Sequence, residues 1–176
     1  VDEAYFHFGS KTAVPLIKKF PNIIVLRTFS KAFGVPSIRA GYTLSNEKNM
    51  SIISKARIAH ELSSVSIAVA EYLLDNYHIV KRNSDLIKKS RKIVKKKLEE
   101  IGLYSRSQFG NYVLIKFKKS DDAIKVVKYL RKKLIYVKGP YSKPWNNYIN
   151  ISLGPPSLMK RFIREIRAAK TRRLFS

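Results

Sequence analysis

Lys31 has different surroundings from most lysines of this chain. The sequence has 36 lysines and arginines, many of them in runs such as KKSRKIVKKK that are typical of a solvated helix face. Lys31 instead follows the apolar run PNIIVLRTF and precedes a turn punctuated by Gly34, with Arg27 and Arg39 nearby. A lysine attacks a carbonyl only as the neutral amine, which burial and neighbouring cations favour. The surroundings therefore favour a lysine that forms an imine with an aldehyde or ketone.

Phosphate donors lie within the same segment. Thr28 and Ser30 precede Lys31 by three residues and one residue, and Arg39 follows it by eight. Two hydroxyls and a guanidinium are the donors that a phosphate monoester needs, because arginine matches its oxygens with two parallel hydrogen bonds. The segment thus suits a small molecule that carries both an aldehyde and a phosphate, and pyridoxal phosphate is such a molecule.

An acid and a phenol at the start of the chain complete this set. Pyridoxal phosphate needs a carboxylate beside its pyridine nitrogen, because protonation there makes the ring an electron sink. Asp2 opens the sequence in VDEAY, at a predicted strand end, and Tyr5 stands three residues later, where it can donate to the phenolic oxygen of the ring. Each part alone is a weak signal, but the ordered set within 42 residues is specific.

These residues resemble fold-type I pyridoxal-phosphate enzymes, and most closely the histidinol-phosphate aminotransferase group within aminotransferase class I/II. The resemblance rests on VDEAYFHF, PNIIVLRTFSKAFG and IRAGY, with weaker support from GNYVLIKF and NISLGPP. It implies the C-terminal half of such an enzyme: part of an α/β large domain with a mostly parallel sheet (1–78), then a small α+β domain (79–176). It also implies a homodimer that moves an amino group between an amino acid, such as glutamate, and a carbonyl substrate.

The resemblance assigns a role to each residue of the set. Lys31 is the lysine that forms the Schiff base and moves the proton, Asp2 contacts the pyridine nitrogen, and Tyr5 contacts the ring oxygen. The residues implied for the phosphate are Thr28, Ser30 and Arg39.

The sequence departs from the family pattern at the predicted substrate site. Relatives carry an arginine for the substrate carboxylate in the strand that here reads NYINISLG, so Asn150 replaces a charge with an amide. Lys138 in YVKG either restores this charge or is a surface lysine. A P-Y-N segment of the family is also replaced, by residues that include His60 and Glu61. The alternative function is therefore a pyridoxal-phosphate-dependent decarboxylase of a phosphorylated amino acid.

The elements that position these residues follow from apolar spacing. PNIIVLRTF predicts a buried, parallel strand, GYTLS a second strand, and 47–77 one or two helices. Beyond them, Ser84 is predicted to cap a helix that ends at Gly102. NYVLIKF, IYVKG and YINISLG predict strands, and the helices predicted around them are SDDAIKVVKYLRKKL and PSLMKRFIREIRAAKTRR.

Composition limits the remaining classes of function. The net charge of +24 raises the question of nucleic acid, but the lysines are interleaved with apolar residues at helical spacing, which favours a solvated surface. Cysteine is absent, which excludes disulfides and thiolate metal sites, and His7, His60 and His78 lack metal-ligand spacing. No run approaches the roughly 20 apolar residues of a membrane span. We expect a cytoplasmic enzyme without a metal, and a piece of a longer chain because the sequence begins at Val1.

Overall fold

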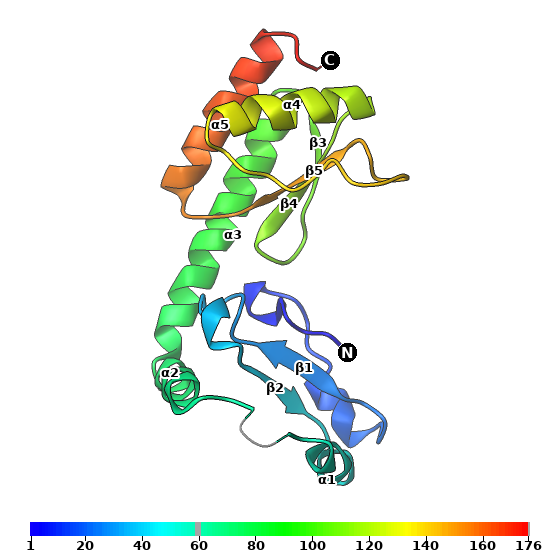
Figure 1. The fold of residues 1–176 in the computed structure, drawn as a ribbon, viewed down its shortest axis with the longest axis vertical. Helices are drawn as coiled ribbons and strands as arrows, with labels where there is room; N and C mark the ends of the chain where they lie inside the picture. The colour runs from blue at the N-terminus through cyan, green and yellow to red at the C-terminus, as the bar shows by residue number, and fades with distance from the viewer. Residues whose placement is uncertain (59–60, 176) are drawn as a thin grey trace. The chain divides into compact units, whose positions relative to one another are not determined.

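The computed structural model describes residues 1–58 and 61–175 and divides into two compact units. We call Val1–Ser84 the N-terminal unit and Asp85–Ser176 the C-terminal unit. Each unit has its own strands and helices, and the division falls inside the long helix α3, Tyr77–Glu99 (Figure 1).

Three extended segments build the sheet of the N-terminal unit. β1 (Val25–Thr28) pairs antiparallel with β2 (Gly41–Leu44). On its other side, β1 meets the start of the chain in a parallel bridge between Asp2 and Leu26. The run predicted as a parallel strand thus forms β1, but its longer pairing is antiparallel. Gly41 permits this pairing, because a Cβ there would lie 2.8 Å from the Arg27 carbonyl oxygen.

Short helices connect and flank these strands. α1 (Glu47–Lys55) and α2 (Ser64–Asp75) are the helices expected within 47–77. The side chains of Asn46 and Ser63 cap them by accepting from backbone amides three residues later, which satisfies donors left free at a helix start. The described part of the unit also contains the short 3₁₀ helices η1 (Phe6–Phe8), η2 (Val14–Lys18) and η3 (Pro36–Ile38).

The prediction that Ser84 caps the next helix is wrong. α3 begins seven residues earlier, at Tyr77, and runs through Ser84 to Glu99. Ser84 is buried inside the helix, and its hydroxyl donates to the His7 carbonyl 2.5 Å away. A long-range contact therefore uses the hydroxyl that the sequence suggests for a cap. The predicted C-terminal end is close, since Gly102 follows with a positive φ of 72°.

An antiparallel sheet of three strands organises the C-terminal unit. Its order is β3 (Tyr104–Arg106), β4 (Tyr112–Lys116) and β5 (Tyr148–Ser152). Alternate residues of β4 and β5 are fully buried, and they pack with side chains of α3, α4 (Ser120–Lys132) and α5 (Pro156–Thr171) in one core. Figure 1 shows α4 lying across the strands. The other face of the sheet carries the remaining strand side chains.

The predicted strand IYVKG is reduced to one bridge. Only Lys138 of this segment pairs, antiparallel with Asn150, next to β5. β3, in contrast, was not predicted. Both segments are short, so neither offers the alternating pattern over four or more residues that identifies a strand in a sequence.

Candidate active site

A tight loop after β1 carries Lys31. Backbone hydrogen bonds join Gly34 to Lys31 and Val35 to Phe29, at 3.1 and 3.3 Å. The rings of Phe29 and Phe33 are buried, with centroids 4.5 Å apart, and they anchor the loop to the core of the unit. These contacts hold the backbone of the loop in place. Lys31 itself is exposed, so its amine is accessible.

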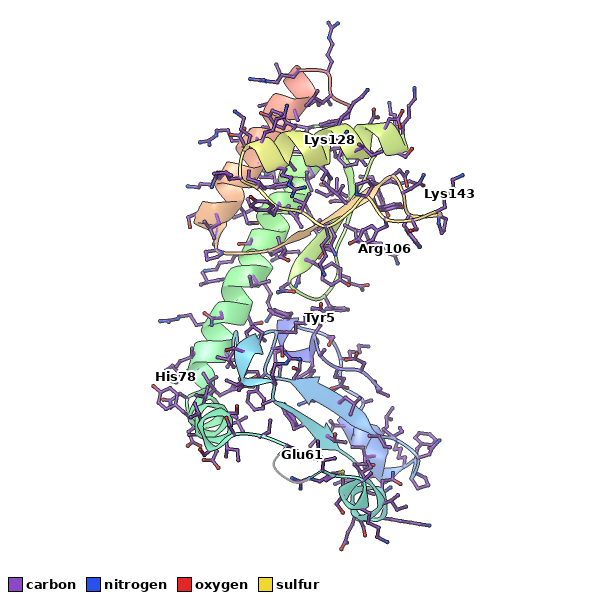
Figure 2. The ribbon with its side chains drawn as sticks, in the orientation of Figure 1. Tyr5, Glu61, His78, Arg106, Lys128 and Lys143 are labelled. Atoms are coloured by element: carbon purple, nitrogen blue, oxygen red, sulfur yellow. The ribbon has the colours of Figure 1, made fainter. Side chains whose placement is uncertain are left out.

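Tyr5 and Asp2 lie at the same end of the N-terminal unit as Lys31. The Lys31 Nζ atom is 5.6 Å from the centroid of the Tyr5 ring. Asp2 bridges to Leu26, and its Oδ1 accepts from the Ala4 amide at 2.8 Å. Figure 2 labels Tyr5 on the N-terminal segment, directly before η1. The structure therefore brings the amine close to the phenol, and it places Asp2 beside β1, the strand that leads to Lys31.

The three residues predicted to bind phosphate line one pocket. Thr28, Ser30 and Arg39 surround a volume of about 350 Å³, with Arg27 and Tyr42 also on its wall. The Thr28 hydroxyl accepts from the Ser30 amide at 3.0 Å, which fixes the start of the loop. Arg39 has a left-handed backbone, with φ 52°, and its exposed guanidinium donates to the Pro36 carbonyl at 2.8 Å. Two hydroxyls and a guanidinium around one pocket fit a phosphate group.

A buried ion pair under this pocket was not predicted. Arg27, expected only as a cation near Lys31, donates to Glu3 Oε2 through Nη2 at 2.9 Å and Nε at 3.1 Å. The Glu3 side chain is 4% exposed and that of Arg27 12%. Thr12 and the Ala13 amide also donate to the carboxylate. Since Glu3 neutralises Arg27, Arg39 is the cation of the pocket without an acid partner among the described residues.

A sequence signal for this pair exists in VDEAY. Adjacent residues of an extended segment point to opposite sides, so only one of Asp2 and Glu3 can face the predicted cofactor. The other acid must point inward and needs a buried cation. Arg27 is the cation that the neighbouring strand offers.

We expect Glu3→Gln to destabilise the protein by about 3–5 kcal/mol, because it leaves the Arg27 charge buried without its partner. Equilibrium urea unfolding measures this change. Glu71→Gln, at an exposed position of α2, is the matched control and should change the free energy of unfolding by less than about 0.5 kcal/mol. Equal effects of the two substitutions would mean that the pair contributes nothing to stability.

His7 packs against Phe33 of the Lys31 loop. Its ring lies edge-on to Phe33 with centroids 4.9 Å apart, and Nδ1 is 2.8 Å from the Tyr77 hydroxyl. Nε2 is buried with no hydrogen-bond partner among the described residues. Burial lowers the pKa of His7, and the Arg27 charge adds to this effect while Glu3 opposes it. The structure therefore favours the neutral imidazole.

The lowered pKa of His7 predicts a loss of stability in mild acid. The unfolded chain takes up the histidine proton from about pH 6.5 downward, whereas the folded chain does so only at lower pH, so stability falls across this window. Urea unfolding midpoints at pH 7 and 5 measure the loss, and His7→Gln should reduce it. His78→Gln, at the exposed start of α3 (Figure 2), should leave it unchanged.

Protonation of Glu3 adds to the loss of stability at still lower pH. Burial alone would raise the pKa of Glu3, but the hydrogen bonds from Ala13, Arg27 and Thr12 outweigh it, so the pKa lies below its usual value. The stability contributed by the Glu3 carboxylate is present above its usual pKa near 4.3 and is lost as the pH falls through the folded value.

The two predicted substrate residues meet in the C-terminal unit. Lys138 and Asn150 exchange two backbone hydrogen bonds of 2.9 and 2.8 Å, and residues directly opposite each other in this way present their side chains on one face of a sheet. Lys138 is exposed. The Asn150 Oδ1 atom is buried and has no hydrogen-bond partner among the described residues.

The remaining sequence features add no further site. His60 lies outside the described residues, and Glu61 forms an ion pair of 2.9 Å with Arg57. Within 1–58 and 61–175, no three potential metal ligands of the kinds His, Asp and Glu gather. No helix in the described part of the chain is long and apolar enough to cross a membrane.

The chain belongs to the family of class I and II aminotransferases, because the model of that family matches residues 1–166. This confirms the resemblance seen in the sequence. Histidinol-phosphate aminotransferase of Pyrococcus furiosus is 34% identical over 171 residues, which cover 95% of this chain and 48% of that protein. The chain thus spans about half the length of the curated relatives that it matches.

Solved structures confirm the predicted fold class. Histidinol-phosphate aminotransferase of Sinorhizobium meliloti, in complex with pyridoxal-5'-phosphate, matches with a TM-score of 0.82 and 30% identity over 95% of this chain and 48% of that one. L-threonine-O-3-phosphate decarboxylase of Porphyromonas gingivalis matches with a TM-score of 0.77 over 95% of this chain and 53% of that one. At 19% identity, this second likeness shows the fold alone.

Proposed function

We propose that this chain forms the C-terminal part of a pyridoxal-phosphate-dependent aminotransferase similar to the histidinol-phosphate group. The observation that carries the proposal is the arrangement around β1, where Lys31 lies beside Tyr5 and the pocket of Thr28, Ser30 and Arg39 follows. When bound, pyridoxal phosphate supplies an aldehyde that takes up amines and a ring that draws electrons from the bonds of Cα.

Lys31 has two tasks in this proposal. Its Nζ atom would hold the cofactor covalently at rest, and as a free amine it would move a proton to and from the substrate Cα. The rigid Phe29–Phe33 loop suits both tasks, because it keeps the amine within reach of one position.

Asp2 and Tyr5 orient and tune the cofactor ring. The Asp2 carboxylate keeps a proton on the pyridine nitrogen, and the Tyr5 hydroxyl donates to the ring oxygen. Asp2 is suited to this role because the backbone amide of Ala4 holds its Oδ1 while the rest of the carboxylate stays exposed.

The phosphate of the cofactor binds Thr28, Ser30 and Arg39. Arg39 contributes the charge, and the two hydroxyls contribute directional hydrogen bonds. Their common pocket supports this role.

We propose 1–78 as part of the cofactor-binding domain and 79–176 as the small domain. The compact units support this division, although they meet at Ser84 and Asp85. The half of the relatives that this chain does not match would supply the rest of the site, so we expect the chain alone to be inactive. A homodimer and a cytoplasmic location are part of the proposal and rest on the resemblance.

The substrates are an amino acid, such as glutamate, and a carbonyl compound. Asn150 and Lys138 contact the substrate in this proposal, with the lysine supplying a charge that the amide lacks. Their pairing across one bridge supports a joint role.

An assay of amino transfer tests the function. The protein as its gene encodes it, loaded with pyridoxal phosphate, is incubated with histidinol phosphate and 2-oxoglutarate. Formation of glutamate that depends on the cofactor is expected. Absence of transfer from histidinol phosphate and from a panel of other amino donors would contradict the proposal.

A decarboxylase is the second candidate, because this chain has Asn150 at the position where the resemblance implies an arginine for the substrate carboxylate. Release of carbon dioxide from L-threonine O-3-phosphate without any keto acid would favour it. Glutamate formation without carbon dioxide would exclude it.

A further inference from the structure

The open face of the three-stranded sheet carries a row of polar side chains. Val113, Ile115, Ile149 and Ile151 point into the core, so the residues between them point to the opposite face. On that face, the bridge and strand registers align four residues side by side, in the order Arg106, Leu114, Asn150 and Lys138.

Arg106 lies two strands from Asn150 in this row. Neighbouring strands are about 4.8 Å apart, so about 10 Å separates the two backbones. Leu114 between them is apolar and partly buried, and it offers no charge to either neighbour. A small group above Leu114 is therefore within reach of both the Arg106 guanidinium and the Asn150 amide.

A pocket lies beside Arg106. It encloses about 240 Å³ and is lined by Arg106, Tyr112 and Leu114, together with the loop residues Ser107, Gln108 and Phe109. Arg91 of α3 fixes this loop, because its guanidinium donates to the carbonyls of Gln108 and Gly110. The Ser107 hydroxyl adds a bond of 2.6 Å to the Tyr112 carbonyl. The wall that carries Arg106 is thus held in place.

Arg106 and Asn150 are both without side-chain partners. No hydrogen bond or ion pair with a described residue involves the Arg106 guanidinium or the Asn150 amide. The acids of the C-terminal unit lie on α3, α4 and α5 or directly after α3, so no strand of the sheet carries one: Asp85, Glu99, Glu100, Asp121, Asp122 and Glu165. Among the described residues, the Arg106 guanidinium therefore has no acid partner on this face, where Lys138 is a second cation and the Asn150 amide is uncharged.

We propose that Arg106 binds an oxyanion group of the substrate, a carboxylate or a phosphate, above Leu114 and together with Asn150. This inference rests on the proposed function and names a residue that determines its specificity. Arg106 then adds, from two strands away, a second positive charge to the one that Lys138 supplies beside Asn150. A guanidinium gives an oxyanion two parallel hydrogen bonds, which a lysine does not.

Steady-state kinetics of Arg106→Gln test this role. Hydrogen bonds to charged groups are worth about 1.5–3 kcal/mol, so KM for the anionic substrate should rise about 10- to 100-fold while kcat changes about threefold at most. Arg106→Lys should recover part of the loss. Arg131→Gln, at an exposed position near the end of α4, is the matched control and should leave KM unchanged.

The KM values of Arg106→Gln for different substrates show whether Arg106 binds a phosphate or a carboxylate. A rise in KM for histidinol phosphate alone assigns Arg106 to a phosphate, and a rise for glutamate or 2-oxoglutarate assigns it to a carboxylate. Wild-type KM values for both in Arg106→Gln would overturn the proposal.

Binding of inorganic phosphate provides a readout without catalysis. Calorimetric titration should show weaker binding to Arg106→Gln than to the wild type, and equal binding to Arg131→Gln. The difference isolates Arg106, because phosphate at the Arg39 pocket contributes equally to all three proteins. If the wild type lacks amino transfer, the proposed function fails, but the titration still tests Arg106. Equal affinities of the wild type and Arg106→Gln for phosphate would overturn the role of Arg106.

Discussion

Lys31→Ala is expected to lose covalent attachment of pyridoxal phosphate and to lower amino transfer by at least about 10²–10⁴-fold, the usual contribution of a positioned proton-transfer group. The physical reason is the position of the amine, which stands on a loop anchored by Phe29 and Phe33, with its Nζ 5.6 Å from the Tyr5 ring centroid. Absorbance spectra and single-turnover rates of the variant measure both losses.

The fold should survive this substitution, because Lys31 is exposed and its loop is held by backbone bonds and by buried rings. Lys55→Ala, at an exposed position of α1, serves as the control and should retain both cofactor and activity. Amino transfer at the wild-type rate in Lys31→Ala would remove Lys31 from the site.

Asp2→Asn is expected to lower kcat by about 10²–10³-fold, the typical effect of removing a group that stabilises charge in the transition state. The amide no longer holds a proton on the pyridine nitrogen, so the ring draws electrons less strongly. Asn keeps an Oδ1 that accepts from the Ala4 amide, which preserves the local backbone. The kcat of amino transfer and the absorbance of the bound cofactor at several pH values measure the change.

Asp75→Asn, at an exposed position of α2, is the control for the loss of one negative charge. It should leave kcat unchanged within about twofold. If Asp2→Asn behaves like this control, the carboxylate has no contact with the ring, and the assignment of Asp2 is wrong.

Local patterns predicted the elements around Lys31 well. The apolar run of β1, the glycine-punctuated loop and β2 are all short-range features, and the hypothesis for the site rests on the residue types Lys, Thr, Ser and Arg within this short segment. The side chain of Asn46 that caps α1 is also a local signal, but it was not predicted.

Long-range contacts account for what the sequence did not reveal. Ser84 has the side chain of a helix cap but donates to His7, 77 residues away, so α3 begins earlier than predicted. Arg27 resembles an active-site cation, yet Glu3 neutralises it from a neighbouring segment. Arg106 and Asn150 lie in one row because of the register of the strands, which the sequence does not reveal. β3 has only three residues, too few for a pattern that predicts a strand.

Borohydride reduction tests the central claim most directly. The protein as its gene encodes it is incubated with pyridoxal phosphate, reduced, digested and mapped by mass spectrometry. The account predicts a visible absorbance band that reduction removes, with the cofactor fixed on the peptide that contains Lys31. Absence of the band, or a cofactor spread over exposed lysines such as Lys55, would contradict it.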